Sequence, residues 1–341
     1  MKITGIILVI LGVLAGIAGF AAPVVGVSAG ISAVNSTDST TYGEGTLVKV
    51  LNTGKLVATP ESPYDENVPI SSVRVTQADT AAMEQQDAKD AGATIFTTVS
   101  TTTRVDTDEE LSVGKAVFAF NPADSQLINC CGASLGDNTN VDFQGVMPLK
   151  FPFGSPEGDV QLFNTTLQKP VTATYVGQGE DYGMTLFKYS QSIPPTQTPA
   201  PPTKVPAVLA AGVVGKLAPE LADQVPASGD LELYEFYSAE NEFLVDPITG
   251  QIVDGTLKEK TTFRLDGGTQ DIVTKVEAEA GSANVEEGAA DIKASSDQLK
   301  MVATASPILI GLGLILLILG IVLIVMGGKK KKAAAVAAAK S

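Results

Sequence analysis

Two apolar stretches bracket the chain, and the segment between them alternates polar and apolar residues. The first stretch carries no charge over residues 6–20 and stays apolar to about residue 27. The second covers residues 308–326, with only glycines among its aliphatic side chains. At about 1.5 Å per residue the second stretch is about 28 Å long, close to the ~30 Å hydrocarbon core of a bilayer. The pattern predicts a transmembrane helix at each end, over residues 1–28 and 307–327.

The first stretch has an alternative interpretation as a signal peptide. Val27, Ser28 and Ala29 would suit a cleavage site between small residues. The apolar stretch is longer than the usual 7–15-residue core of a signal peptide, which favours a retained anchor. Cleavage of the N-terminal span therefore stays open.

Residues 29–306 have the pattern of a β-rich domain. Leu257, Glu259 and Thr261 would point to one face of a strand, while Lys258 and Lys260 would point to the other. Similar runs rich in Val, Ile, Thr, Phe and Tyr predict strands near residues 46–51, 70–76, 94–105, 116–120, 171–176, 184–190, 231–237, 243–245, 251–253, 256–265 and 271–278. Residues 246–250 lie between two of them and predict a hairpin loop. We expect a mainly β domain, built as a curved antiparallel sheet or a sandwich.

Two segments of this domain differ from the strand pattern. Residues 285–303 predict a juxtamembrane helix that leads into the second span. Residues 192–226 contain six prolines near their start and predict an extended arm, followed by a small apolar segment at residues 207–217. That segment would be a flap that contacts lipid, or a surface loop with a short helix on the core. The candidate lipid-contact residues are Val208, Leu209, Val213, Val214 and Leu217.

The distribution of charge predicts the orientation in the membrane. Lys329, Lys330, Lys331 and Lys332 follow the second span directly, and Lys2 precedes the first. Lysines beside spans stay cytoplasmic, so both termini are expected in the cytoplasm, with a basic tail at residues 328–341 near anionic headgroups. All 38 acidic residues lie between the spans, against 17 of the 23 basic ones. The main domain is therefore expected outside the plasma membrane, and its acidity argues against a nucleic-acid partner.

Composition also limits the chemistry. The chain has no histidine, which excludes Ser-His-Asp and Cys-His catalytic sets and histidine-ligated zinc. The acidic residues Asp106, Asp108, Glu109 and Glu110 lack the glycine spacing of a calcium loop and indicate a solvated loop. We expect no metal, no cofactor and no enzymatic activity.

Cys130 and Cys131 are the two cysteines of the chain, and they are adjacent. Outside the cytoplasm thiols tend to oxidise, so a structural disulfide, free buried thiols and a redox role all stay open. A vicinal disulfide would form a rigid plate against a ligand or a neighbouring strand. The next residues, Gly132 to Gly136, match the G-x-S-x-G pattern of serine hydrolases. Without a histidine we interpret this pattern as a glycine-rich turn.

Glycines recur on one face of each apolar stretch. Gly12, Gly16 and Gly19 are spaced to share one helix face, and Gly313 and Gly320 are seven residues apart. Such stripes let two membrane helices approach closely, although glycine is also common in membrane helices. The spacing favours pairing of the two spans.

Several motifs taken together resemble a known family. They are the runs at residues 129–132, 149–153, 163–167, 187–196 and 245–253. In this order, between two apolar spans, they resemble the actinobacterial membrane proteins grouped as the porin PorA family. The resemblance implies a plasma-membrane protein linked to the mycolate-type envelope and to lipoglycan synthesis. The chain departs from that pattern in lacking tryptophan and in its long proline segment.

These observations lead to two functional expectations. The first is a non-enzymatic accessory protein of envelope biogenesis that binds or presents a lipid or glycolipid precursor beside an envelope lipid exporter or other membrane proteins. The second is a structural scaffold without a ligand cavity. A carboxylate-dependent enzyme acting on envelope sugars is a weaker third, because no pair of acids stands out.

Overall fold

The computed structural model describes residues 6–18, 38–58 and 62–338. It divides into a sheet unit, Val34–Lys293, and a helical unit that combines Met1–Ala33 with Ala294–Ser341. The two units are described in turn.

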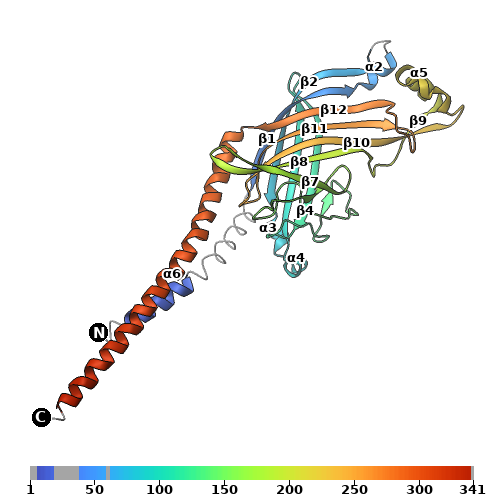
Figure 1. Cartoon of the computed structure of the whole chain (residues 1–341). Helices are drawn as coiled ribbons and strands as arrows, with labels where there is room; N and C mark the ends of the chain where they lie inside the picture. Colours follow the sequence, from blue (N-terminus) through green and yellow to red (C-terminus); the bar gives the residue numbers. More distant parts are fainter. Residues whose placement is uncertain (1–5, 19–37, 59–61, 339–341) are drawn as a thin grey trace. The chain divides into compact units, whose positions relative to one another are not determined.

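The sheet unit is built on one large antiparallel sheet (Figure 1). The described residues give it twelve strands: β1 (Ser39–Leu51), β2 (Tyr64–Ala78), β3 (Thr94–Arg104), β4 (Glu109–Phe120), β5 (Ser134–Leu135), β6 (Val160–Asn164), β7 (Lys169–Asp181), β8 (Met184–Gln197), β9 (Thr203–Pro206), β10 (Asp230–Val245), β11 (Ile252–Arg264) and β12 (Val273–Ala283). Their order is β5-β4-β3-β2-β1-β12-β11-β10-β8-β7-β6, and β9 pairs with β10. The expected curved antiparallel sheet is confirmed.

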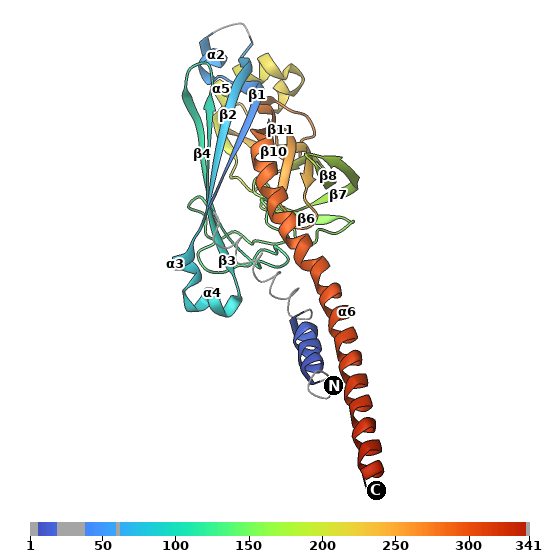
Figure 2. The same ribbon diagram turned by 90° about the vertical axis from the view of Figure 1, so that its left-hand side faces the viewer.

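The sheet curls into a half-barrel around β1. Figure 2 shows β1, β2 and β4 running side by side, with β8, β10 and β11 turned away from them. Two glycines of β1 allow the close approach at this bend. A Cβ atom on Gly43 would lie 2.6 Å from the Ser72 hydroxyl oxygen, and one on Gly45 would lie 2.8 Å from Cα of Ala280. Larger residues at these positions would push β2 and β12 away from β1.

The two faces of the sheet differ in chemistry. The inner face carries several of the apolar clusters, including Leu47 and Val68, which are directly opposite each other in β1 and β2. The outer face carries ion pairs such as Lys188–Glu242 at 2.8 Å, beside the apolar cluster of Met184 and Leu186 under the start of α6. Alternation of side chains along each strand produces this division. The alternation expected for residues 257–261 is confirmed, because Glu259 shares the inner face with Ala278 and Leu47.

An aromatic cluster forms the core where β8, β10 and β11 meet the segment after Lys150. The Phe151 ring is buried, with its centre 4.5 Å from the Tyr189 ring and 6.2 Å from the Phe243 ring. The N–H of Phe151 donates to the carbonyl oxygen of Gly250 in the β10–β11 hairpin at 2.7 Å. Residues 149–153, 187–189 and 246–250 therefore meet in space, which gives a packing reason for these sequence runs.

The proline segment differs from the expected arm. β8 continues through Pro194 and Pro195 to Gln197, because a register shift between Tyr237 and Ala239 of β10 lies opposite these prolines. A proline lacks the N–H that a regular ladder needs, and a bulge removes that requirement. The sequence pattern missed β5, β6 and β9. It also divided β10 and β11 into two strands each, whereas each is continuous.

The described helices of the sheet unit are short, except for the one that leaves it. They are α2 (Thr53–Ala58), α3 (Thr80–Met83), α4 (Gln86–Ala91), α5 (Ala207–Leu217) and the 3₁₀ helix η1 (Pro219–Gln224). α6 (Val285–Ala338) begins in the sheet unit, where buried Ala289 packs with Met184, Leu186 and Val253. It continues without interruption into the helical unit, so the expected juxtamembrane helix and the second span form one helix.

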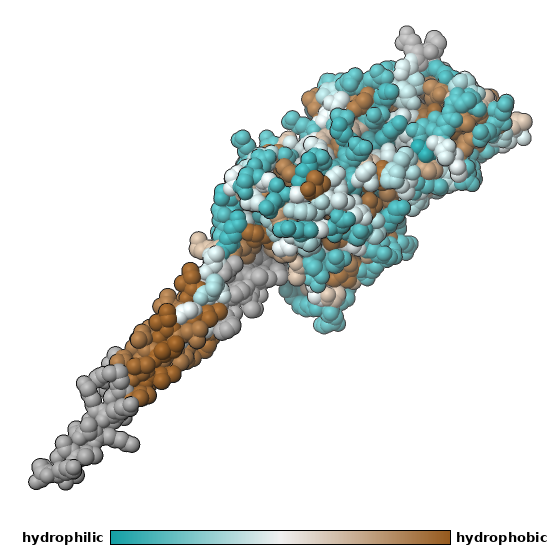
Figure 3. Space-filling model, viewed as in Figure 1, coloured by the Kyte–Doolittle hydropathy of each residue, from teal (hydrophilic) through white to brown (hydrophobic). Residues whose placement is uncertain are grey.

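The helical unit contains the apolar part of α6 and a short N-terminal helix. Among the described residues, Val285–Val325 is the one stretch long and apolar enough to cross a membrane. Figure 3 shows its apolar residues gathered along the helix. The N-terminal helix is described only over Ile6–Ala18, about 20 Å at 1.5 Å per residue. Residues 19–28 of the expected first span lie outside the described residues, so a second membrane-spanning helix is not confirmed.

Candidate functional site

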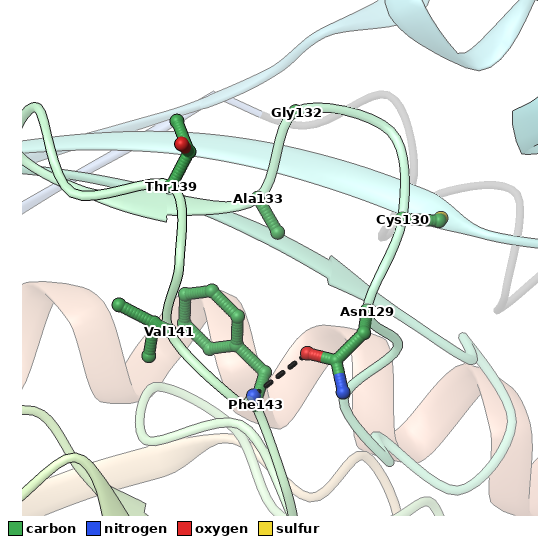
Figure 4. Close-up of a pocket in the computed structure, with 7 residues that line it drawn as sticks. All are labelled: Asn129, Cys130, Gly132, Ala133, Thr139, Val141 and Phe143. Carbon is green, nitrogen blue, oxygen red and sulfur yellow. Dashed lines mark hydrogen bonds between the residues drawn. The ribbon is translucent and has the colours of Figure 1, made fainter.

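A pocket of about 280 Å³ lies in the long connection between β4 and β6 (Figure 4). Its lining residues are Asn129, Cys130, Gly132, Ala133, Thr139, Val141 and Phe143. They come from two stretches of the connection, 129–133 and 139–143, which face each other across the pocket. Both stretches rest on the inner-face cluster of β3 and β4.

The Asn129 side chain holds the two stretches together. Its amide oxygen accepts a hydrogen bond from the backbone N–H of Phe143 at 2.7 Å. Its amide nitrogen donates to a carboxylate oxygen of Asp142 at 2.8 Å. One side chain thus ties the first stretch to two consecutive residues of the second, which fixes the width of the pocket.

Cys130 and Cys131 are joined in a disulfide at the turn that closes the first stretch. The backbone there is left-handed at two successive residues, with φ of 61° at Cys131 and 81° at Gly132. Glycine adopts this conformation without steric strain, which explains the Cys-Cys-Gly order. Both cysteines are half-buried against the cluster of β3 and β4, and Cys130 lines the pocket. Cys130 therefore contributes to the wall of the pocket, and the disulfide fixes the turn to which it belongs.

The floor of the pocket is apolar and firmly packed. Ala133, Val141 and Phe143 are all buried in the cluster below it. The Phe143 ring centre lies 5.1 Å from that of Phe163 in β6 and 6.0 Å from that of Phe118 in β4. Thr139 and Asn129 are exposed and supply polar groups at the rim. An apolar floor with a few polar groups at the rim suits an apolar group that carries a polar end.

The sequence analysis pointed to residues 129–133 as a turn but missed Thr139, Val141 and Phe143. Asn129 precedes the turn, and Val141 and Phe143 alternate with exposed Asp142 in a segment without regular structure. The alternation was the available signal. However, this short alternating segment does not belong to a recognisable strand, so nothing in the sequence indicated that Val141 and Phe143 lie opposite the cysteine turn.

The G-x-S-x-G pattern has no catalytic geometry. Ser134 belongs to β5 and is buried, and Gly132 and Gly136 adopt positive φ on either side of it. The turn interpretation agrees with this placement. A nucleophile must be accessible to its substrate and close to a base, and the chain has no histidine.

Lys150 is buried beside another serine. Its Nζ lies 3.4 Å from Oγ of Ser125, 3.4 Å from the carbonyl oxygen of Phe151 and 3.6 Å from the centre of the Phe153 ring. Burial lowers the pKa of Lys150 from 10.5 to about 7. Ser125 is itself fully buried, and its hydroxyl donates to the Phe151 carbonyl oxygen at 3.0 Å. The pair resembles a serine–lysine dyad in distance only, because both side chains are buried and neither lines the pocket between Asn129 and Phe143.

α5 divides the five candidate lipid-contact residues between two environments. Val208 is 86% exposed and Leu209 is 56% exposed. Val214 is buried, and Leu217 is partly buried, in the cluster formed with β10 and β12. Val213 is half-buried. The helix is therefore seated on the sheet by one face and presents Val208 and Leu209 to the outside.

The glycine stripes meet in the helical unit. A Cβ atom on Gly12 would lie 2.7 Å from the carbonyl oxygen of Gly313, and one on Gly313 would lie 2.8 Å from the backbone nitrogen of Gly16. Gly320 is buried, and Gly19 lies outside the described residues. The N-terminal helix and α6 thus touch backbone to backbone. Lys329, Lys330, Lys331 and Lys332 belong to the last turns of α6, but their side chains lie outside the described part.

The described residues contain no group of three or more acids or cysteines placed to hold a metal ion. In the acidic loop after β3, Asp106 accepts a hydrogen bond from Arg104 at 2.6 Å, and this bond lowers the pKa of Asp106. The acidic loop is therefore bound to its own strand.

Comparison with known proteins gives one match. The sequence model of a family described as Porin PorA matches residues 4–322, nearly the whole chain. This match confirms the resemblance drawn from the sequence runs. No curated protein matches the chain. The family and the apolar part of α6 together indicate a membrane-associated protein.

Proposed function

The chain belongs to the Porin PorA family, and on this premise we propose that it is a non-enzymatic accessory protein of the plasma membrane that binds or presents a lipid or glycolipid precursor. The sheet unit would lie outside the membrane and both termini in the cytoplasm. Its partners would be membrane lipids and, beside them, an envelope lipid exporter or other membrane proteins.

Three features support this orientation. The lysines after the second span favour a cytoplasmic C-terminus. The disulfide between Cys130 and Cys131 suits an oxidising compartment, which a cytoplasmic sheet unit would not have. All 38 acidic residues lie between the spans, in the part of the chain that the flanking lysines leave outside.

The observation that carries the proposal is the pocket between Asn129 and Phe143. Its apolar floor and polar rim match the chemistry of an acyl chain next to a polar group. Its volume of about 280 Å³ is just below the usual range of ligand pockets, so it would hold only part of a lipid. The expected lipid interior under residues 207–217 lacks comparable support, because side chains of α5, β10 and β12 fill that position.

The proposal is tested by blocking the pocket in the full-length protein in lipid nanodiscs. A photoactivatable fatty acid with a diazirine in its chain serves as the probe. Thr139→Phe puts a ring at the exposed rim without disturbing a buried contact. We expect the wild-type protein to be labelled at residues 129–143, as mapped by peptide mass spectrometry, and Thr139→Phe to lose that labelling.

Thr107→Phe is the matched control, because Thr107 is equally a surface threonine but lies in the β3–β4 turn. It should be labelled like the wild type. Equal labelling of residues 129–143 in wild type and Thr139→Phe, or labelling confined to the membrane helices in both, would refute the pocket as a lipid site.

α5 offers a further point of lipid contact under the same proposal. Val208 and Leu209 project from a helix that is otherwise packed on the sheet. Exposed apolar side chains on an anchored helix are suited to acyl-chain contact. The double substitution Val208→Ser/Leu209→Ser should reduce probe labelling of α5, whereas Val113→Ser/Val176→Ser, at similarly exposed positions of β4 and β7, should leave it unchanged.

The outer face of β1 to β4 favours a scaffold as the second candidate function. Tyr42 and Val73 are directly opposite each other, as are Val75 and Val99, and all four are exposed. Exposed apolar side chains that lie next to one another in this way can form a binding surface for another protein. Val73→Lys/Val99→Lys should abolish photo-cross-links from this face to protein partners in native membranes. Cross-links that persist unchanged would remove the support for a scaffold.

A further inference from the structure

A polar band interrupts the apolar inner face of the sheet. It consists of Ser72 and Arg74 in β2, Ser100 and Thr102 in β3, and Ser112 in β4. The register places Ser72, Thr102 and Ser112 side by side in one row, and Arg74 beside Ser100 in the next row. All five side chains are exposed or half-exposed.

The rows on both sides of the band are buried. Val68 and Ile70 on one side are 3% and 8% exposed, and Thr76 and Thr98 on the other are 8% and 5% exposed. The same face is therefore covered by protein before and after the band, but open at the band itself. Small hydroxyl side chains leave room there that larger residues would fill.

Arg74 is the cationic group of this band and has little compensation. Its Nε donates to the Ser100 hydroxyl oxygen at 3.2 Å. The described residues place no carboxylate within ion-pair distance of its guanidinium, whereas Arg104 and Arg264 each bind an aspartate at 2.6 Å. The protein around the curl displaces part of the water near Arg74 and lowers its pKa, although the side chain remains exposed at the surface, and the charge of Glu259 opposes that effect only in part.

Glu259 is the acid that faces Arg74 across the curl of the sheet. It lies in β11, three strand spacings from β2, about 14 Å along a flat sheet. Its carboxylate accepts the hydroxyl hydrogen of Tyr237 at 2.7 Å. That bond engages one oxygen of the carboxylate, and the described residues show no ion pair between Glu259 and Arg74, so the remaining N–H groups of Arg74 can serve another acceptor.

We propose that the polar band binds a phosphate-type oxyanion, with the Arg74 guanidinium as its charge partner and the hydroxyls of Ser72, Ser100, Thr102 and Ser112 as additional donors. A planar guanidinium presents two parallel N–H groups that match two phosphate oxygens. Hydroxyl groups adapt their direction to the remaining oxygens. The oxyanion would come from a phospholipid head group or from free phosphate, and only the first source rests on the proposed function.

Binding is measured by isothermal titration calorimetry on the full-length protein in phosphate-free dodecyl maltoside. The probes are inorganic phosphate and dihexanoyl phosphatidic acid, a soluble lipid with a terminal phosphate. We expect Arg74→Gln to weaken binding by about tenfold or more, since hydrogen bonds to charged groups are the strong ones. Arg74→Lys keeps the charge but loses the planar fork, so its loss should be smaller.

Two further variants test the charges on the two faces. Lys115→Gln removes one positive charge from the outer face, opposite exposed Val99 of β3, and should not change binding. Glu259→Gln removes the opposing negative charge while keeping an oxygen for Tyr237, and should strengthen binding severalfold. Ser100→Ala should weaken binding without a change in melting temperature. An unchanged melting temperature would show that the weaker binding is not caused by misfolding.

Binding of both probes would assign a general phosphate site, and binding of the lipid alone would assign a head-group site. No binding of either probe at millimolar concentration, or equal binding by wild type and Arg74→Gln, would overturn the proposal. The fatty-acid labelling of residues 129–143 is independent of Arg74, so the two proposals can fail separately.

Discussion

Gly250 lies against the backbone of Phe151, and a Cβ atom at Gly250 would overlap the Phe151 carbonyl oxygen. The same atom would come within 2.5 Å of the Pro152 carbonyl oxygen. Gly250 also has a φ of 73°, in the region that favours glycine. This contact fixes the β10–β11 hairpin on the segment that carries the buried Phe151 ring.

Gly250→Ala should therefore destabilise the protein strongly. Positive φ alone costs a non-glycine residue about 1 kcal/mol, and backbone overlap that requires the hairpin to move adds to it, so we expect a loss of about 3 kcal/mol. The loss appears as a lower melting temperature in circular dichroism of the detergent-solubilised protein. Gly154→Ala is the control, because Gly154 also has positive φ, 64°, but open space around its Cβ position. Equal losses at both positions would mean that the Phe151 contact contributes nothing.

Lys150 makes stability depend on pH. Its folded pKa, about 7, is below the ordinary value of 10.5, so between these values the unfolded chain binds the proton and the folded protein does not. Stability should fall as pH decreases from 10 to 7, by at most about 1.4 kcal/mol per pH unit, and this contribution should be constant below about pH 7. Lys150→Met removes the penalty and should raise the unfolding free energy at pH 7 by about 4 kcal/mol at most.

Urea unfolding at pH 7, 8 and 9 measures this effect. The measurements stay below pH 10 for a reason. Burial raises the pKa of Tyr189 to about 12, so the ionisation of this tyrosine also affects stability at higher pH. Lys115→Met removes a lysine from an exposed position of β4 and should retain the wild-type slope. A slope in Lys150→Met equal to that of the wild type would show that Lys150 is charged in the folded protein.

The sequence predicted most of the sheet because its strands alternate strongly. Residues 256–265 show the reason. Leu257, Phe263 and Leu265 occupy alternate positions to Lys258, Lys260 and Arg264, and β11 covers all but the last of these residues. The prolines of β8 misled the prediction for a local reason. The bulge that accommodates Pro194 and Pro195 lies in β8, where the step from Ile193 to Thr196 is one residue longer than the step from Ala239 to Tyr237 in β10. A sequence does not show where along a strand the pairing with its neighbour will shift.

The candidate site was less predictable, because its residues meet through irregular backbone. Cys130 and Cys131 attracted attention as adjacent cysteines, but Asn129 determines the pocket through two side-chain hydrogen bonds to residues 142 and 143. The sequence did not identify Arg74 as a site residue either, because its unusual environment depends on the curl of the sheet that brings β11 opposite β2. Such properties arise from tertiary structure and not from local pattern.

The backbone contact between Gly12 and Gly313 predicts a specific effect on the pairing of the apolar helices. Gly12→Ile should force the helices apart, because its Cβ would lie 2.7 Å from the Gly313 carbonyl oxygen. Loss of close packing between membrane helices should lower stability by about 1–2 kcal/mol, measured as a lower midpoint in SDS unfolding from mixed micelles. Gly16→Ile is the control, because the space around the Gly16 Cβ position is open. A midpoint unchanged by Gly12→Ile would show that the pair does not contribute to stability.

Asn129→Ala should loosen the pocket without unfolding the protein. The substitution removes the acceptor for the Phe143 N–H and the donor to Asp142, and a lost hydrogen bond to a partly buried N–H costs about 1–2 kcal/mol. Because Asn129 ties the two pocket stretches together, hydrogen exchange at residues 139–143 should become faster while exchange in β3 and β4 stays slow. Asn140→Ala is the matched control, since Asn140 is an exposed asparagine of the same connection that does not line the pocket. Unchanged exchange at residue 143 in Asn129→Ala would mean that the packing of Phe143 against Phe118 and Phe163 holds the pocket without the asparagine.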